Sequence, residues 1–216
     1  MISKASHITS LLISSQSNSN IHPIICDVTS KPHLQAAVDE ITKKSSHVDV
    51  LVCNAGMAPP TPKPQPTETS SISEVRNYFF STLSTEDHAT VLNLNNTAVM
   101  VTTFAFLELL DAANKRNHVE GTGRVRSQVI AVGSAGAFFR RGSDFVYNAS
   151  KAATTHLIKQ MATFLVPWDI RCNIIEPGCK LQISFLFHGA EELTIVKGFF
   201  HKSQPISPSS LRKTEG

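Results

Sequence analysis

The sequence predicts an α/β fold with a parallel sheet. Several short apolar runs have the length of strands and do not alternate with polar residues, which is typical of strands buried on both faces. The longer segments between them place apolar residues on one face of a helix. Strands and helices therefore follow one another in turn, and this order produces a parallel sheet covered by helices.

The first half of the chain contains two predicted strands and one helix. Residues 21–26 form a short apolar run, and residues 48–53 form a second one. Between them, residues 31–46 carry apolar side chains on one helix face, and Pro32 stands where proline commonly begins a helix. We expect a strand–helix–strand unit from this stretch.

A proline-rich segment follows the second predicted strand. Residues 58–67 hold five of the eleven prolines in the chain, a composition typical of extended, polyproline-like backbone. One interpretation is a peptide ligand for a proline-binding module. The interpretation that we favour is a long loop above the carboxyl ends of the strands, where α/β sheets bind their ligands.

The second half contains two long helical segments and two further strands. Residues 86–115 are apolar over a wide arc, so more than one face of this segment should be buried. Residues 128–132 and 170–175 have the composition of strands. Residues 144–165 form a helix that Pro167 ends.

The composition is that of one ordinary globular domain. The chain has 216 residues, of which 41% are hydrophobic and 17% charged, so it can form a core and is unlike a disordered protein. The net charge of +3 is not concentrated in a basic run, which argues against a nucleic-acid partner. No apolar stretch is long enough for a membrane span, and the nine histidines show no metal-ligand spacing.

The cysteines indicate a reducing compartment. Cys26, Cys53 and Cys172 lie in or beside predicted strands, and none of the four cysteines forms a C-x-x-C pair. We therefore expect buried free thiols and a cytoplasmic location. Residues 1–20 are serine-rich and make a poor secretory signal.

Ser134, Tyr147 and Lys151 form the candidate reactive group. A strand delivers Ser134 at its carboxyl end, and the i, i+4 spacing places Tyr147 beside Lys151 on one helix face. A tyrosine phenol has a pKa of about 10, and bringing it near 7 takes roughly 4 kcal/mol, which one ammonium at about 4 Å can supply. Tyr147 is thus a candidate general acid/base and Ser134 a hydrogen-bond donor to a substrate oxygen, although the Tyr-x-x-x-Lys spacing alone also arises by chance.

Five segments, taken in chain order, resemble the short-chain dehydrogenase/reductase family. They are Cys26-Asp27-Val28-Thr29, Cys53-Asn54-Ala55-Gly56, Asn95-Asn96-Thr97-Ala98, Ser134 with Tyr147-Asn148-Ala149-Ser150-Lys151, and Glu176-Pro177-Gly178. The resemblance covers about residues 21–178. It implies a Rossmann-like, doubly wound parallel sheet and an NAD(P)-dependent oxidoreductase.

The resemblance also implies a role for each catalytic residue. Tyr147 would donate or accept the proton, Lys151 would assist it and hold the nicotinamide ribose, and Ser134 would polarise the substrate carbonyl. Asn95 would hold a water in a proton relay to the lysine. Asn93 and Asn96 lie close enough in sequence that this register could slip.

The cofactor-binding residues follow from the same resemblance. Asp27 would accept a hydrogen bond from the adenine amino group, or alternatively it caps the following turn. The residues implied to contact the cofactor are Asp27, Val28, Asn54, Ala55, Gly56, Tyr147, Lys151, Pro177 and Gly178. NAD and NADP are not distinguished, and no metal is expected.

The match fails at both ends. The family binds the cofactor pyrophosphate on a glycine-rich turn after its first strand, whereas Gly56 is the first glycine of this chain. We therefore expect an incomplete Rossmann-like sheet without the first βαβ unit, with unpaired strand edges, as in a truncated or degenerate chain or an imperfect gene model. The expected organisation is a weakly helical or irregular segment 1–20, a partial domain 21–178 and a divergent, partly disordered tail 179–216.

Two functional interpretations remain open at this point. The first is hydride transfer between NAD or NADP and a small carbonyl or alcohol substrate. The alternative is a truncated, non-catalytic chain that acts as an interaction partner or lacks a stable function. In the family, the helices matching residues 86–115 and 144–165 form a subunit interface, so a homodimer or homotetramer through them is expected, without nucleic acid or membrane.

Overall fold

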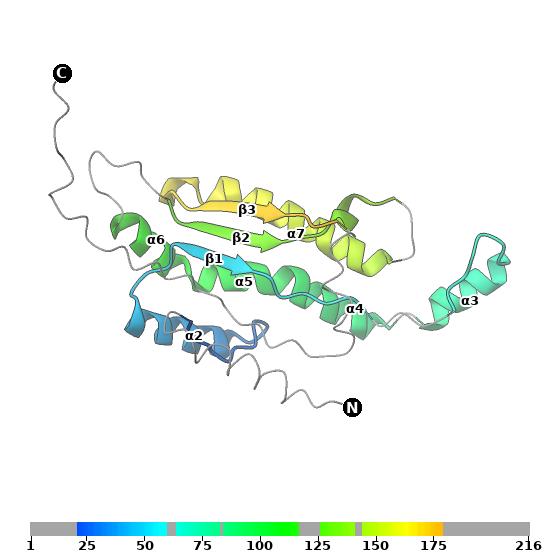
Figure 1. The fold of residues 1–216 in the computed structure, drawn as a ribbon. Coiled ribbons are helices and arrows are strands. Elements are labelled where there is room, and N and C mark those ends of the chain that lie inside the picture. The colour runs from blue at the N-terminus through cyan, green and yellow to red at the C-terminus, as the bar shows by residue number, and fades with distance from the viewer. Residues whose placement is uncertain (1–20, 60–63, 83, 117–125, 141–143, 179–216) are drawn as a thin grey trace, which may run out of the picture.

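Three parallel strands form the sheet, in the order β1-β2-β3. They are β1 at Val50–Cys53, β2 at Gln128–Val132 and β3 at Arg171–Ile175 (Figure 1). The structure is a computed structural model, and it describes residues 21–59, 64–82, 84–116, 126–140 and 144–178. Both pairings are parallel, so the predicted α/β class with a parallel sheet is confirmed.

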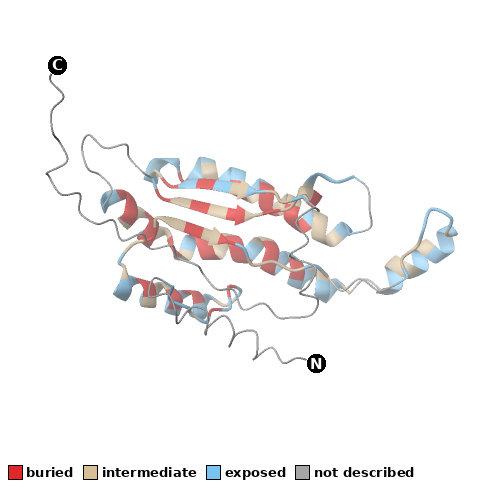
Figure 2. Ribbon diagram, viewed as in Figure 1, coloured by how far each residue is buried: buried red, intermediate tan, exposed pale blue. Residues whose placement is uncertain are grey.

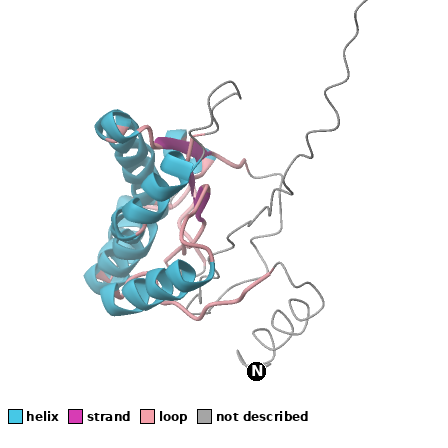
Figure 3. Ribbon diagram, turned by 90° about the vertical axis from the view of Figure 1, so that its left-hand side faces the viewer, coloured by secondary structure: helices cyan, strands magenta, loops and turns pink. Residues whose placement is uncertain are grey.

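The register brings the carboxyl ends of the strands to one edge. Cys53 pairs with Ala131, and Val132 pairs with Ile175. Alternate residues such as Leu51, Val129 and Cys172 are buried beneath the helices. The turned view shows the helices gathered on one side of the strands (Figure 3).

Helix α2, Lys31–Lys44, forms as the sequence predicts. The Ser30 hydroxyl caps it by accepting a hydrogen bond from the His33 N–H, and Pro32 lies in its first turn, where a missing N–H costs nothing. Its apolar face packs on helix α5, together with Cys26 and Leu94, in a second, smaller core cluster.

The predicted strand at residues 21–26 is wrong. This segment has no regular secondary structure, and its first three residues are exposed, although Cys26 at its end is fully buried and Ile25 is 72% exposed. A strand needs a neighbour for its backbone N–H and C=O groups, and none of the described strands lies beside this segment. Apolar composition alone was therefore not enough to make a strand of this segment.

The predicted helix at residues 86–115 is confirmed as helical but is divided into four parts. These are α4 at Thr85–Leu92, a π-helical turn at Asn93–Thr97, α5 at Ala98–Ala105 and α6 at Leu107–Arg116. The axis bends by 49° between α5 and α6, at the fully buried Phe106. No single helix in the described ranges is long and apolar enough to cross a membrane, and this bent pair meets the length and composition criteria only when both parts are counted together.

Helix α7, Phe145–Phe164, matches the predicted helix at residues 144–165, and a 3-10 turn at Val166–Trp168 contains the Pro167 that ends it. Helix α3, Ile72–Thr82, was not expected. Its signal was a capping box, in which Glu74 accepts from the Ser71 N–H at 2.6 Å and the Ser71 hydroxyl accepts from the Glu74 N–H at 3.3 Å.

The main core lies between the sheet and helices α5, α6 and α7, where buried residues concentrate (Figure 2). Phe106, Leu110 and Val129 are fully buried there. Cys26, Cys53 and Cys172 are buried free thiols, as the sequence predicted. Three sets of predicted residues lie outside the described ones: residues 1–20, residues 60–63 of the proline-rich loop and the tail at 179–216.

Candidate active site

Ser134 lies immediately beyond the end of β2, as its place in the sequence predicts. It begins a short 3-10 helix, Ala135–Phe138, and its hydroxyl oxygen accepts a hydrogen bond from the Gly136 N–H at 3.1 Å. No acceptor for the hydroxyl proton is found among the residues that the structure describes. Ser134 can therefore donate this proton to a substrate oxygen.

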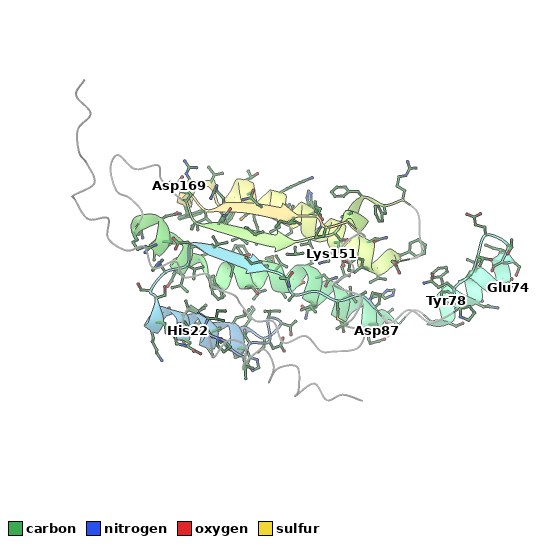
Figure 4. All side chains as sticks on the ribbon, viewed as in Figure 1. His22, Glu74, Tyr78, Asp87, Lys151 and Asp169 are labelled. Atoms are coloured by element: carbon green, nitrogen blue, oxygen red, sulfur yellow. The ribbon has the colours of Figure 1, made fainter. Side chains whose placement is uncertain are left out.

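Lys151 is buried, with 5% of its surface exposed. Its ammonium nitrogen donates to the carbonyl oxygen of Val132 at 2.9 Å, so the side chain reaches from α7 to the end of β2 (Figure 4). Only Gly133 separates Val132 from Ser134 in the chain. A buried positive charge therefore lies at the strand end that carries the serine.

Tyr147 stands one helical turn before Lys151 and is half-buried. The Lys151 ammonium nitrogen lies 5.9 Å from the centre of the Tyr147 ring, within the range of cation–π attraction. The Tyr147 hydroxyl forms no hydrogen bond with another described residue. The predicted pairing of phenol and ammonium on one face of the helix is thus present in the structure.

Asn95 joins the loop after β1 to helix α7. Its amide oxygen accepts from the Met57 N–H at 2.8 Å, and its amide nitrogen donates to the Met57 carbonyl at 2.9 Å and to the Ser150 hydroxyl at 2.8 Å. The Ser150 hydroxyl in turn donates to the Tyr147 carbonyl at 2.7 Å. These bonds satisfy a side chain that is only 1% exposed.

The π-helical turn explains why Asn95, rather than its neighbours, takes this place. Asn93 is exposed and Asn96 is half-buried, whereas Asn95 points into the protein. The Asn95 carbonyl accepts from the Thr154 hydroxyl at 2.7 Å. A π-turn shifts the helical register and frees backbone groups for such bonds, and π-turns often mark functional sites.

Asn54, Ala55 and Gly56 follow β1 and approach the same region. A Cβ atom added to Gly56 would lie 3.1 Å from the Asn95 amide oxygen and 3.1 Å from the Lys151 ammonium nitrogen. Gly56 thus packs closely against both residues. Asn54 is exposed and Ala55 is half-buried.

Asp27 and Val28 lie apart from this group, at the start of the segment leading into α2. The Asp27 carboxylate accepts from the Thr29 hydroxyl at 2.7 Å and from its N–H at 2.9 Å, and these two hydrogen bonds lower the Asp27 pKa. Val28 is 5% exposed and packs in the second core cluster. These contacts therefore support the interpretation that Asp27 caps the following turn.

Pro177 and Gly178 continue from β3 beside the serine loop. The Pro177 carbonyl accepts from the Ala135 N–H at 2.9 Å, and a Cβ added to Gly178 would meet no atom of the described residues within 4 Å. The open space at Gly178 lies at the same edge of the sheet as Ser134. No cluster of three or more potential metal ligands occurs within the described ranges.

Two residues of the site were not singled out from the sequence. Glu176 accepts hydrogen bonds from the Ser134 N–H and from the Thr155 hydroxyl, and Ser150 links Asn95 to the tyrosine helix. Both stood inside quoted motifs. Only the folded chain reveals their partners, which are 42 and 55 residues away in sequence.

A profile of the short chain dehydrogenase family matches residues 3–181. The chain is 46% identical over 175 residues to the short-chain dehydrogenase/reductase VdtF of Byssochlamys spectabilis, covering 74% of this chain and 57% of VdtF. It is 43% identical over 166 residues to SAT3 of Stachybotrys chartarum, covering 72% of this chain and 60% of SAT3. The chain therefore spans little more than half the length of these curated relatives.

Solved structures of other proteins are also similar to this chain. An NADH-dependent reductase A1-R' complexed with NAD is 26% identical, with a TM-score of 0.55 over 71% of this chain and 55% of the reductase. The RhlG–NADP complex of Pseudomonas aeruginosa is 25% identical, with a TM-score of 0.53 over 71% of this chain and 51% of RhlG. With the profile match over most of its length and the curated relatives above 40% identity, the chain belongs to the short-chain dehydrogenase/reductase family of oxidoreductases.

Proposed function

We propose that the chain acts as an NAD(P)-dependent oxidoreductase that interconverts a carbonyl and an alcohol. The observation that carries this proposal is the buried Lys151 ammonium, 2.9 Å from the Val132 carbonyl and 5.9 Å from the Tyr147 ring centre. The positive charge thus lies beside the Tyr147 ring and at the end of the strand that leads to Ser134, at the carboxyl edge of a parallel sheet, where α/β folds bind ligands. A phenol, an ammonium and a serine hydroxyl can together supply a proton and a hydrogen bond to a carbonyl oxygen.

The residues present fit the nicotinamide end of such a cofactor. Lys151 and Tyr147 offer hydrogen-bond donors for its ribose, and the space beside Gly178 is open. The cofactor, when bound, supplies or accepts the hydride. A glycine-rich phosphate turn after a strand is not found among the described residues, so the contacts to the pyrophosphate are not assigned.

Each residue then has one task. Ser134 donates a hydrogen bond to the substrate oxygen, because its own oxygen already accepts from Gly136 and its proton remains to be donated. Tyr147 gives its proton to that oxygen during reduction and removes it during oxidation. Lys151 supplies a positive charge beside the phenol, and Asn95 holds the loop at Met57 against the tyrosine helix and anchors the proton relay.

Asp27, Val28, Asn54, Ala55 and Gly56 are the proposed contacts toward the rest of the cofactor. The structure supports Gly56 most directly, since its missing side chain lets the backbone lie against Asn95 and Lys151. Asp27 would have to share a carboxylate that already accepts two hydrogen bonds from Thr29.

The test is cofactor binding followed by turnover. NADH and NADPH are titrated separately against the full chain, with nicotinamide fluorescence and thermal shift as readouts. Saturable binding, and oxidation of the bound cofactor by a panel of small ketones and aldehydes, support the proposal. An absence of binding to a folded chain overturns it.

A second candidate function is a non-catalytic partner that pairs through its helices. It is favoured by apolar side chains exposed on α4, α5 and α7, where Leu92 is 42%, Phe104 43% and Phe164 59% exposed. Helices in these positions are the expected subunit interface. A stable dimer in light scattering, without saturable cofactor binding, would favour this function over the enzyme.

A further inference from the structure

Glu176 directly follows strand β3, and both of its carboxylate oxygens are used. Oε2 accepts from the backbone N–H of Ser134 at 2.5 Å, and Oε1 accepts from the hydroxyl of Thr155 at 2.6 Å. The two donors belong to different elements, the loop after β2 and helix α7. Hydrogen bonds to an ionised acceptor are shorter and stronger than neutral ones.

Gly133 makes room for this carboxylate. A Cβ atom built on Gly133 would overlap the Glu176 carboxylate group, so a side chain at this position and the carboxylate exclude each other. Backbone bonds hold the two segments together on both sides, from the Gly133 N–H to the Ile175 carbonyl at 2.8 Å and from the Ala135 N–H to the Pro177 carbonyl at 2.9 Å. The carboxylate thus occupies a site defined by the backbone.

The two donors bear directly on the reactive group. Ser134 carries the hydroxyl proposed to polarise the substrate, and its backbone N–H is the one that Glu176 holds. Thr155 lies one helical turn after Lys151 on α7, and its hydroxyl is also 2.9 Å from the Lys151 carbonyl. One carboxylate therefore connects the serine loop with the helix that carries Tyr147 and Lys151.

We propose that Glu176 is a positioning residue, which fixes the Ser134 hydroxyl relative to the Tyr147–Lys151 helix. This inference rests on the proposed function for its catalytic consequence, but the connection itself is independent of turnover. A displacement of the serine of about 1 Å would lower the rate by about 10²-fold. In Glu176→Gln, the amide oxygen can accept from the Ser134 N–H and the amide nitrogen can donate to the Thr155 hydroxyl, whose proton can go to the Lys151 carbonyl, whereas alanine keeps neither contact.

The first experiment measures the connection without turnover. In the full chain, the Ser134 amide proton resonance should move to a lower chemical shift in Glu176→Gln, because a neutral oxygen then replaces the carboxylate as acceptor, and further in Glu176→Ala. In unfolding experiments, Gly133→Ala should raise the unfolding equilibrium constant at least about tenfold more in the native background than in Glu176→Ala, because removing the carboxylate makes room for the methyl group. If Glu176→Ala does not fold, the Ser134 amide proton resonance in Glu176→Gln tests the connection instead.

The second experiment measures the catalytic consequence. With NADPH or NADH and the best ketone of the panel, Glu176→Ala should lower kcat about 10²-fold with little change in the cofactor Kd, and Glu176→Gln should restore most of the rate. Glu108→Ala, at an exposed carboxylate on α6, is the matched control and should leave kcat unchanged.

The outcomes separate this inference from the proposed function. The connection is overturned if the Ser134 amide proton resonance is unchanged by substitution of Glu176. It is also overturned if the effects of Gly133→Ala and Glu176→Ala on the free energy of unfolding are additive. Equal kcat in Glu176→Ala and the unsubstituted chain overturns the positioning role. An intact connection in a chain that neither binds nor oxidises a nicotinamide cofactor overturns the proposed function and, with it, the catalytic part of the inference.

Discussion

The ammonium nitrogen of Lys151 lies 2.9 Å from the carbonyl oxygen of Val132, the last residue of β2. A charge buried to 5% exposure needs such a partner, because desolvation without one is costly. The contact anchors helix α7 at the carboxyl end of the sheet. It thereby sets the place of Tyr147 one turn earlier, within 6 Å of the same ammonium.

Tyr147→Phe should lower cofactor-dependent turnover by about 10²- to 10⁴-fold, because it removes the proposed proton donor. The free energy of unfolding should change by less than about 0.5 kcal/mol, since the hydroxyl bonds to no other described residue. Nicotinamide absorbance measures the first effect and urea unfolding the second. Tyr78→Phe, the same change in the other tyrosine of the chain, is the control and should leave turnover intact. Full activity in Tyr147→Phe would refute the role of the phenol.

Gly56→Ala should destabilise the protein by about 1–3 kcal/mol, because the new methyl group would press on Asn95 and Lys151, each 3.1 Å away. Gly178→Ala is the matched control for stability, since its Cβ would lie more than 4 Å from every atom in the described part of the chain. Urea midpoints compared at equal m-values give both numbers. Equal midpoints for the two variants would show that Gly56 is not tightly packed.

Asn95→Ala should cost on the order of 2–3 kcal/mol, because the Met57 N–H and carbonyl lose their partner and the Ser150 hydroxyl loses the hydrogen bond that it accepts. Asn93→Ala changes the same residue type two positions earlier in the same π-turn, where the side chain is exposed, and should cost less than about 0.5 kcal/mol. Chemical denaturation distinguishes the two. A larger loss in Asn93→Ala would contradict the register of the turn.

Cys53 should make stability fall at alkaline pH. Burial raises its pKa from 9.0 to about 12, so between these values the unfolded chain loses a proton that the folded chain keeps. The stabilising contribution is therefore complete below pH 9 and is lost as the pH rises toward 12.

Unfolding of the native chain and of Cys53→Ala, compared at pH 8 and pH 10.5, tests this. The native chain should lose about 2 kcal/mol more than the variant over this interval, because Cys53→Ala removes one titrating group. Burial raises the pKa of Cys172 to about 11. This thiol should therefore also lower stability at alkaline pH, by a smaller amount that is the same in both proteins. Parallel pH profiles for the two proteins would contradict the burial of Cys53.

Much of the candidate site could be predicted because its chemistry resides in local sequence. The i, i+4 spacing of Tyr147 and Lys151 fixes their common helix face, and an apolar run ending in Gly133-Ser134 predicts a serine at a strand end. The structure places the Lys151 ammonium 5.9 Å from the Tyr147 ring centre and against the end of the strand that precedes Ser134. Their roles in catalysis stay predictions until turnover is measured.

Other features depended on partners that sequence patterns do not reveal. Residues 21–26 have the composition of a strand, but strand formation requires a neighbour and none of the described strands lies there. In the sequence, Glu176 is part of a turn motif. Its hydrogen bonds with Ser134 and Thr155 can be seen only in the folded chain. Helix α3 had a local signal, the Ser71–Glu74 capping box, which the proline-rich context obscured.

From the residues alone, the class of the fold, most of its helices and strands and the i, i+4 placement of Tyr147 and Lys151 could be predicted, because helical periodicity and apolar runs are local properties. Tertiary structure decided which strands pair, which of three asparagines turns inward, and which carboxylate holds the serine loop. Those outcomes depend on contacts between segments far apart in the chain, where burial and hydrogen-bond satisfaction, rather than local propensity, select the arrangement.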